Sequence, residues 1–383
     1  MKSLFTIKSG GAASWAIRLA ATVALVALAI GVPTAGGNPT IGYCLDAFVL
    51  MTAAMSLNLL LGFTGQISIG HSAFFGIGAY ATAIGVSRYH YSPFVTMPIA
   101  FVVAFIVGVV VSLPALRIKG IYLALVTLSL GLVYPQFLKW PKVAGFTGGP
   151  KGLDKAGFNF GRKNREYSIF GWKPFGDMRG DGALPFYFWI GLGMVLITYL
   201  VCRGVVKSRV GRSIVAIRDN ETAAAVMGVN LPYTKAIVFG LSAGLCALPG
   251  CLSTIRTNNV LPDSGYILVL GSIVFLVVMV IGGAGSLWGP IVGSVVYIAV
   301  KVRTSDWSAD PKHIPALLRP LLDWSKSPVG DGIFATLLIV LMFVAPFGLV
   351  GLSKKWSMRV VAVVPRRAGT GTLVPASSAI AED

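Results

Sequence analysis

Long apolar stretches separated by short polar segments recur along almost the whole chain. A membrane-spanning helix needs about 20 mostly apolar residues, and ten stretches reach or approach that length. They predict an all-α polytopic membrane protein with about ten transmembrane helices. The ten stretches are 15–32, 41–63, 68–86, 93–113, 121–138, 184–202, 236–252, 267–281, 287–302 and 332–350.

The first stretch also has the features of a secretory signal, because Lys2, Lys8 and Arg18 precede or begin the apolar run 19–32. However, no clear small-x-small cleavage site follows this run, and nine further stretches lie behind it. We interpret the first stretch as a retained signal anchor.

Composition supports a membrane protein. Hydrophobic residues make up 55% of the chain and charged residues only 12%, against about 25% charged in soluble domains. The net charge of +18 would suggest nucleic-acid binding in a soluble protein. In a membrane protein, basic residues gather in cytoplasmic loops instead, so we expect a lipid bilayer and no nucleic-acid partner.

The distribution of Lys and Arg does not fix the orientation directly. With the N-terminus inside, equal numbers fall on the two sides, and segment 139–183 alone holds nine of those outside. If this segment is a separate folded excursion, the inside is the more basic. This predicts a multi-pass membrane protein with both termini cytoplasmic. Its parts are an N-terminal transmembrane half (1–138), an extracytoplasmic loop (139–183), a C-terminal half (184–350) with a cytoplasmic loop (203–235), and a basic, disordered cytoplasmic tail (351–383).

The cytoplasmic loop predicts two short helices. Asp219 or Asn220 can cap the second helix, and Gly228 can end it. An amphipathic segment that only anchors the chain to the membrane explains the periodicity equally well. The apolar positions at helical spacing are Ile214, Ile217, Ala224 and Met227, and the expected exposed charges are Arg218, Asp219 and Glu221.

Glycine turns join apolar stretches in both halves of the chain, as Gly62-x-x-Gly65 and as Gly282-x-x-Gly285. The two turns make the halves weakly similar. Small residues here allow close helix packing, which is the simpler interpretation, or an unwound backbone that acts as a hinge. Gly70 and Gly289 are further candidates for either role.

Polar side chains inside apolar stretches are costly and need an explanation. Asn58, Gln66 and His71 flank the first glycine turn, and Tyr80 follows in the next stretch. They can hydrogen-bond an unwound backbone or contact a transported solute. Asp46 lies close enough to the end of its stretch to reach the membrane interface.

No motif in the sequence indicates a catalytic site or a metal site. The four cysteines lie within or beside apolar stretches without paired spacing, and the three histidines are far apart. No G-x-x-x-x-G-K-[ST] motif for ATP occurs. We therefore predict a non-catalytic chain with no metal and no cofactor of its own.

Several motifs together resemble a known family. Glu221-Thr-Ala-Ala224, followed by Gly228, is similar to the EAA-type loop by which ABC importer permeases contact their ATP-binding subunits. The wider pattern, over about 43–350, resembles permeases of branched-chain amino-acid ABC importers, the LivM-like subunits in particular. It comprises GRS (211–213), AIRDNE (216–221), MG (227–228), LNLLLGFTGQIS (57–68), GH (70–71), PALR (114–117), GIYLA (120–124), TGGP (147–150), GL (152–153) and IGGAGSLWGP (281–290). Segments 158–178 and 301–331 are longer and more polar than the loops of that family.

The resemblance implies a type II-like ABC importer permease of the cell inner membrane with two related halves. The expected partners are a second homologous permease subunit, two ATP-binding subunits that hold ATP and Mg, and an extracytoplasmic solute-binding protein, which the basic outer loop would contact. Closure of the ATPase pair would pull on the loop 203–235, hereafter the coupling loop. The coupling residues would be Arg212, Arg218, Asp219, Glu221, Ala224 and Gly228, and the pathway residues Asn58, Gln66, His71 and Tyr80.

Other functions remain open at this stage. A urea or amide ABC permease shares the architecture. An ion-coupled secondary carrier would bury several carboxylates, whereas only Asp46 lies inside an apolar stretch. A membrane scaffold or receptor would leave the coupling loop without an ATPase.

Overall fold

The computed structural model describes residues 5–8, 31, 37–115, 121–154, 183–309, 336, 348–351 and 361–364. The chain divides into a main unit, 32–352, and a unit of the two terminal segments, 1–31 and 353–383. In the terminal unit, β1 (Phe5–Lys8) pairs in parallel with β4 (Val361–Val364). Part of the tail predicted to be disordered therefore forms a strand. The cytoplasmic location of both termini stays a prediction.

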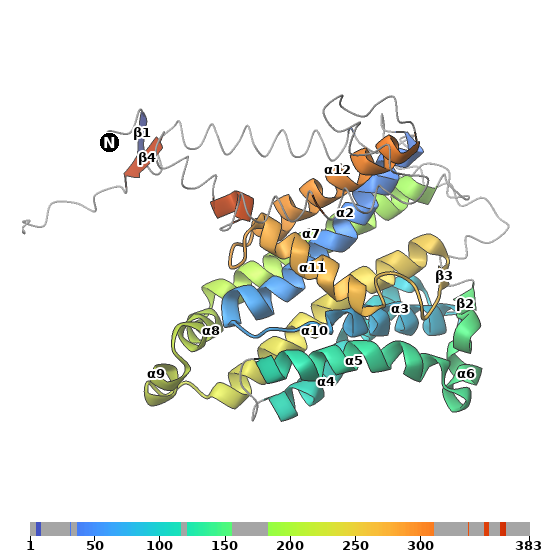
Figure 1. The fold of residues 1–383 in the computed structure, drawn as a ribbon, viewed down its shortest axis with the longest axis horizontal. Coiled ribbons are helices and arrows are strands. Elements are labelled where there is room, and N and C mark those ends of the chain that lie inside the picture. The colour runs from blue at the N-terminus through green and yellow to red at the C-terminus, as the bar shows by residue number, and fades with distance from the viewer. Residues whose placement is uncertain are drawn as a thin grey trace, which may run out of the picture. The chain divides into compact units, whose positions relative to one another are not determined.

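Helices dominate the main unit (Figure 1). Short strands β2 (Leu153–Asp154) and β3 (Asn259–Val260) form an antiparallel pair. The helices are α2 (Asn38–Leu57), continued by the π-helix η1 (Asn58–Gly62), α3 (His71–Ser87), α4 (Pro93–Ala115), α5 (Ile121–Lys139), α6 (Pro141–Thr147), the 3-10 helix η2 (Gly149–Lys151), α7 (Leu184–Lys207), α8 (Arg209–Asp219), α9 (Glu221–Val226), α10 (Leu231–Thr257), α11 (Val269–Gly282) and α12 (Gly289–Ala309).

Eight of the ten predicted stretches are helices in the described part of the chain, and the first and last lie almost wholly outside it. Five described helices are long and apolar enough to cross a membrane: Asn38–Gly62, Pro93–Leu113, Tyr122–Lys139, Leu184–Lys207 and Leu231–Thr257. Val269–Gly282 is apolar but shorter. The helical, multi-span architecture is thus confirmed, and the count of ten stays a prediction.

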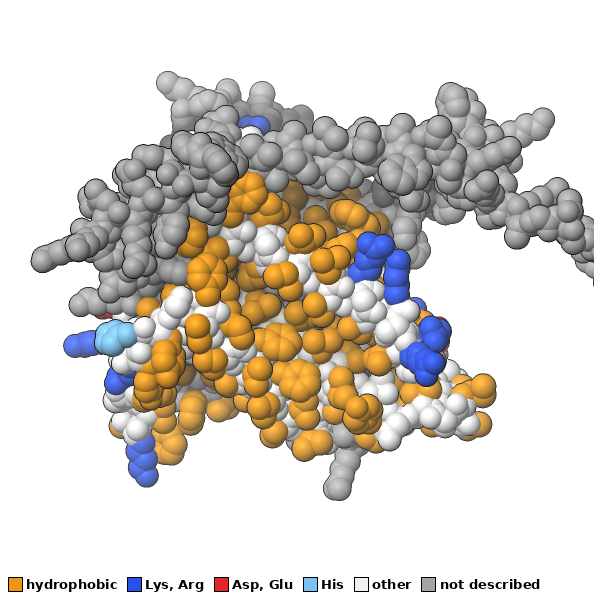
Figure 2. All heavy atoms as spheres, turned by 180° about the vertical axis from the view of Figure 1, so that it is seen from behind, with side chains coloured by type: hydrophobic (Ala, Val, Ile, Leu, Met, Phe, Trp, Pro, Cys, Tyr) orange, Lys and Arg blue, Asp and Glu red, His pale blue; other side chains and the backbone are white. Residues whose placement is uncertain are grey.

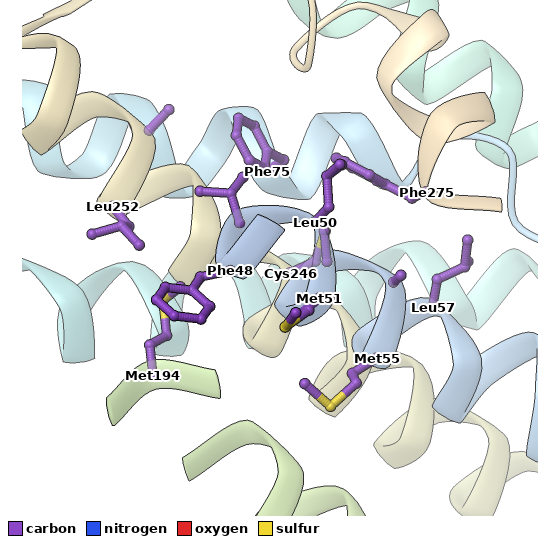
Figure 3. Close-up of a cluster of buried hydrophobic side chains, with 14 of the residues drawn as sticks. Phe48, Leu50, Met51, Met55, Leu57, Phe75, Met194, Cys246, Leu252 and Phe275 are labelled. Atoms are coloured by element: carbon purple, nitrogen blue, oxygen red, sulfur yellow. The ribbon is translucent and has the colours of Figure 1, made fainter. Parts of the chain in front are cut away.

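Helices α2 and α10 form the centre of the main unit. In the most apolar 18-residue segment of each of these two helices, 83% and 78% is buried inside the protein. In the corresponding segments of α4, α5 and α7, only 22%, 33% and 28% is buried. Helix α2 is apolar on all sides because α7, α10, α11 and α12 surround it. In Figure 3, Phe48 on α2 packs beside Met194 on α7, within one continuous apolar core.

The outward faces of α4, α5 and α7 are apolar and exposed, with residues such as Ile106, Leu132 and Ile197. Figure 2 shows a broad hydrophobic face with Lys and Arg at its two opposite margins. An apolar band of this extent between basic margins is typical of a membrane-embedded surface.

The ends of the bundle differ in character. At one end lie α8 and α9, and at the other lie α6, β2 and β3 (Figure 1). At the second end, the Lys139 Nζ to Asp263 Oδ1 distance is 2.6 Å. Near it, Asp46 of α2 pairs with Arg256 of α10. The pair neutralises the single carboxylate of the 41–63 stretch, so Asp46 has a partner within the protein.

Helix α10 extends five residues beyond each end of the predicted stretch 236–252. Hydropathy could not predict this extension, because both added turns contain a charged residue. Lys235 and Arg256 are accommodated there because each is paired with a carboxylate of another helix.

Candidate functional site

Local capping explains the shape of the coupling loop. The Ser208 hydroxyl accepts from the backbone N–H of Gly211 at 3.3 Å and begins α8, while Asn220 Oδ1 accepts from Ala223 N–H at 3.0 Å and begins α9. Gly228, at φ +84°, stops the second helix. The two predicted helices are confirmed, and of the two predicted caps Asn220 is the one used.

The coupling loop packs one face on the bundle and exposes the other. Ile214, Ile217 and Ala224 are buried, as their spacing predicts. The prediction that Met227 joins them is wrong, because α9 ends at Val226 and the chain then turns. Val226 and Met227 are both 83% exposed, so the tip of the loop presents an apolar surface. Arg212 and Asp219 are exposed on the same loop.

Glu221, which was predicted to be an exposed charge, is only partly exposed. Its carboxylate accepts from Lys235 Nζ of α10 at 2.7 Å, and the two side chains are only 28% and 14% exposed. This ion pair fastens the start of α9 to a central helix. The sequence does not single out Lys235, because this residue stands next to an apolar stretch and no motif surrounds it.

The first glycine turn contains a helix end whose carbonyl groups need partners. Local groups of residues 64–66 satisfy three of them. The fourth, the Gly62 carbonyl, accepts from Arg218 Nη1 of α8 at 3.0 Å. The local bonds are Thr64 Oγ1 to Leu59 O at 3.1 Å, Gln66 N to Leu60 O at 3.2 Å and Gly65 N to Leu61 O at 3.1 Å.

Asn58 connects this turn to the second glycine turn. Its Oδ1 accepts from Gly285 N–H at 2.8 Å, and its Nδ2 donates to Ser286 O at 2.9 Å. The side chain is almost fully buried. Two turns that lie more than 200 residues apart in the sequence are therefore side by side, and Asn58 satisfies backbone groups rather than lining an open passage.

The two glycine turns approach each other so closely that only glycine fits where they meet. A Cβ on Gly62 would lie 2.5 Å from Gly285 N and would overlap the Asn58 amide. Gly65, at φ +74°, leaves space for the side chain of Arg218. Of the other predicted glycines, Gly285 has φ +75° and faces Gly62, while a Cβ on Gly70, Gly282 or Gly289 would overlap a neighbouring carbonyl oxygen.

Both ring nitrogens of His71 have a hydrogen-bond partner inside the protein. Its Nδ1 lies 2.9 Å from Ser68 Oγ, and its Nε2 lies 2.8 Å from Ser242 Oγ. Ser242 donates its single hydroxyl hydrogen to Ser56 O at 2.6 Å, so its oxygen accepts from His71 Nε2–H. His71 Nε2 therefore carries a hydrogen, and both ring nitrogens have hydrogen-bond partners.

Replacing His71 with alanine should lower stability without changing the transported solute. The change removes two buried hydrogen bonds and leaves a cavity, with an expected cost of about 2 to 4 kcal/mol. Thermal unfolding in detergent measures the loss, and exposed His90→Asn is the control. An unchanged melting temperature together with an altered solute preference would instead place His71 on the pathway.

Five buried polar atoms have no hydrogen-bond partner among the described residues: Gln66 Nε2, Ser72 Oγ, Tyr80 Oη, Trp189 Nε1 and Thr198 Oγ1. Ser72 and Tyr80 lie eight residues apart on α3, on the same helix face. Unsatisfied buried polar groups are rare and need an explanation. Gln66 and Tyr80 therefore stay pathway candidates, and Ser72, Trp189 and Thr198 meet the same criterion although the sequence did not single them out.

Comparison with known families agrees with this geometry. The profile of the family described as "Branched-chain amino acid transport system / permease component" matches residues 40–344, most of the chain. The chain belongs to this family. The resemblance drawn from its motifs is confirmed, and with its apolar helices this permease is a multi-pass membrane protein.

Relatives of the permease carry related names. The high-affinity branched-chain amino acid transport permease LivM of Escherichia coli K12 is 27% identical over 297 residues, 75% of this chain and 68% of the relative. A probable LivM of Methanocaldococcus jannaschii is 21% identical over 253 residues, 66% of each chain. The ribose import permease RbsC of Haemophilus influenzae is 31% identical, but only over 118 residues, 30% of this chain and 35% of the relative. No solved structure matches.

Proposed function

We propose that this permease is the transmembrane subunit of an ATP-driven importer of branched-chain or similar small amphipathic amino acids. The observation that carries the proposal is the coupling loop, which exposes an apolar tip and is tied to the glycine turns by Arg218. The LivM relatives extend over much more of the chain than the sugar permeases do, which favours an amino acid as solute. Urea or amide import is the alternative that the test must separate.

We assign to each proposed partner a surface of the permease on which it would bind. Two ATP-binding subunits, which hold ATP and Mg, engage the coupling loop at Val226 and Met227. Lipid and a second permease subunit cover the apolar faces of α4, α5 and α7. A solute-binding protein docks at the opposite end, beside α6 and β2. In this arrangement the coupling loop and both termini face the cytoplasm and the protein lies in the inner membrane.

The energy must come from these partners. Thousandfold accumulation of a neutral solute needs about 4 kcal/mol. Movement of the coupling loop would rock the helix bundle around the glycine turns, in the manner of hinged alternating access. Gln66, Ser72 and Tyr80 are the side chains proposed to meet the solute, because each offers an unpartnered polar atom and all three lie beside the first glycine turn or on α3, which follows it.

The test is reconstitution with the ATP-binding subunits, second permease and binding protein from neighbouring reading frames. Proteoliposomes should accumulate radiolabelled leucine only with ATP, and should not accumulate urea or ribose. The detergent-solubilised permease should retain the ATP-binding subunits through affinity purification. ATP-independent leucine uptake, or uptake of urea in place of leucine, contradicts the proposal.

A further inference from the structure

Arg218 reaches inward from the coupling loop. It lies in the last turn of α8, and its side chain is 42% exposed. Its Cγ lies 3.0 Å from the position that a Cβ on Gly65 would take, and its Nη1 lies 3.0 Å from Gly62 O. The same Nη1 lies 3.5 Å from the corresponding Cβ position of Gly285. Arg218 therefore hydrogen-bonds to the first glycine turn and lies beside the second.

A continuous set of contacts leads from α8 into both halves of the transmembrane bundle. Arg218 donates to the carbonyl of Gly62, and Asn58, on the same π-helix, clamps Gly285 and Ser286 through two hydrogen bonds. We call Asn58, Gly62, Gly65, Gly285 and Ser286 the glycine junction. π-Helical turns are found frequently at functional positions, which fits a junction that must rearrange.

The bond from Arg218 to the junction is suited to being broken and remade. Arg218 Nε and Nη2 each lie 3.3 Å from Asp219 Oδ1, so the guanidinium contacts two acceptors at once. Because the guanidinium is partly exposed, water can replace the bond to Gly62 without leaving a buried charge. The buried Asn58 clamp has no such substitute.

We propose that Arg218 is a positioning residue that transmits movement of α8 and α9 to the glycine junction, acting on the bundle rather than on an ATPase. The proposal rests on the proposed function and assigns the internal route by which it operates. Displacement of α8 moves the hydrogen-bond donor of Gly62 O, and Asn58 passes the change to the α11–α12 turn. The two halves then rearrange together.

The experiment measures leucine imported per ATP hydrolysed in the reconstituted complex. Arg218→Ala should reduce this ratio about tenfold or more, within the usual range of coupling energies. Arg218→Lys should retain part of it, because an ammonium group can still donate to Gly62 O. Arg209→Ala, which removes the same charge from the first turn of α8, should keep the wild-type ratio, since Arg209 is exposed and distant along the helix.

A combined variant tests the route. If Arg218 acts through Asn58, then Arg218→Ala with Asn58→Ala should be no less coupled than the worse single variant. An unchanged ratio for Arg218→Ala overturns the proposal. Equal losses in Arg209→Ala overturn it too, as does loss of the ATP-binding subunits from purified Arg218→Ala. Failure of the proposed function differs from all three, because wild-type protein would then show no ATP-dependent leucine import.

Discussion

Gly78→Val is expected to destabilise the permease strongly. Gly78 of α3 packs directly on α10, where any Cβ would overlap the Ala247 carbonyl oxygen and lie 2.6 Å from Ala247 Cα. Both clashes involve backbone, which a change of side-chain rotamer cannot relieve. Because α10 is central to the bundle, we expect a loss of about 3 kcal/mol or more.

A matched substitution on α7 separates this clash from the general cost of valine in a helix. In the described part of the chain, no atom beyond the neighbouring backbone of α7 lies within 4 Å of the Cβ position of Gly193, so Gly193→Val should leave folding nearly unchanged. Size-exclusion profiles and thermal unfolding of both variants, purified in the same detergent, make the comparison. Comparable yields and melting temperatures for the two would show that α3 and α10 do not approach as closely as described.

The contrast between these glycines shows where sequence information ends. Gly62 and Gly282 could be singled out because they interrupt apolar stretches, which is a local feature. Gly78 and Gly193 both lie inside apolar helices, and nothing local distinguishes them. What differs is the surface that each faces, which depends on how α3 and α7 pack.

The same limit applies to the polar residues. Asn58 and His71 were recognisable from sequence because polar groups are rare in membrane spans, but their roles depend on Ser286 and Ser242, which are more than 170 residues away. Helices, in contrast, follow from local periodicity, and the caps at Asn220 and Gly228 follow from local chemistry. Met227 was misplaced because its spacing continued a periodicity beyond the end of the helix.

Reversing the charge of Glu221 is expected to abolish most ATP-driven import. Glu221→Lys would place a second ammonium group beside Lys235, which is only 14% exposed, so the attraction that holds α9 on α10 becomes repulsion. Removing one partner of a half-buried pair leaves a poorly solvated charge. Leucine uptake should fall by about tenfold or more, within the range of coupling energies between sites, as measured in reconstituted vesicles.

The double variant Glu221→Lys with Lys235→Glu decides how Glu221 contributes. If its role is to fasten α9 to the bundle, the exchanged pair restores the attraction and most of the uptake. If the carboxylate itself contacts an ATP-binding subunit, the exchanged pair stays inactive although α9 is again held in place. Arg209→Glu is the control for a charge reversal on the loop, because Arg209 is exposed and lies in the first turn of α8, at the far end from Arg218. Restoration by the exchanged pair would mean that the acidic residue of this loop stabilises the loop, and that its apolar tip provides the contact with the ATPase.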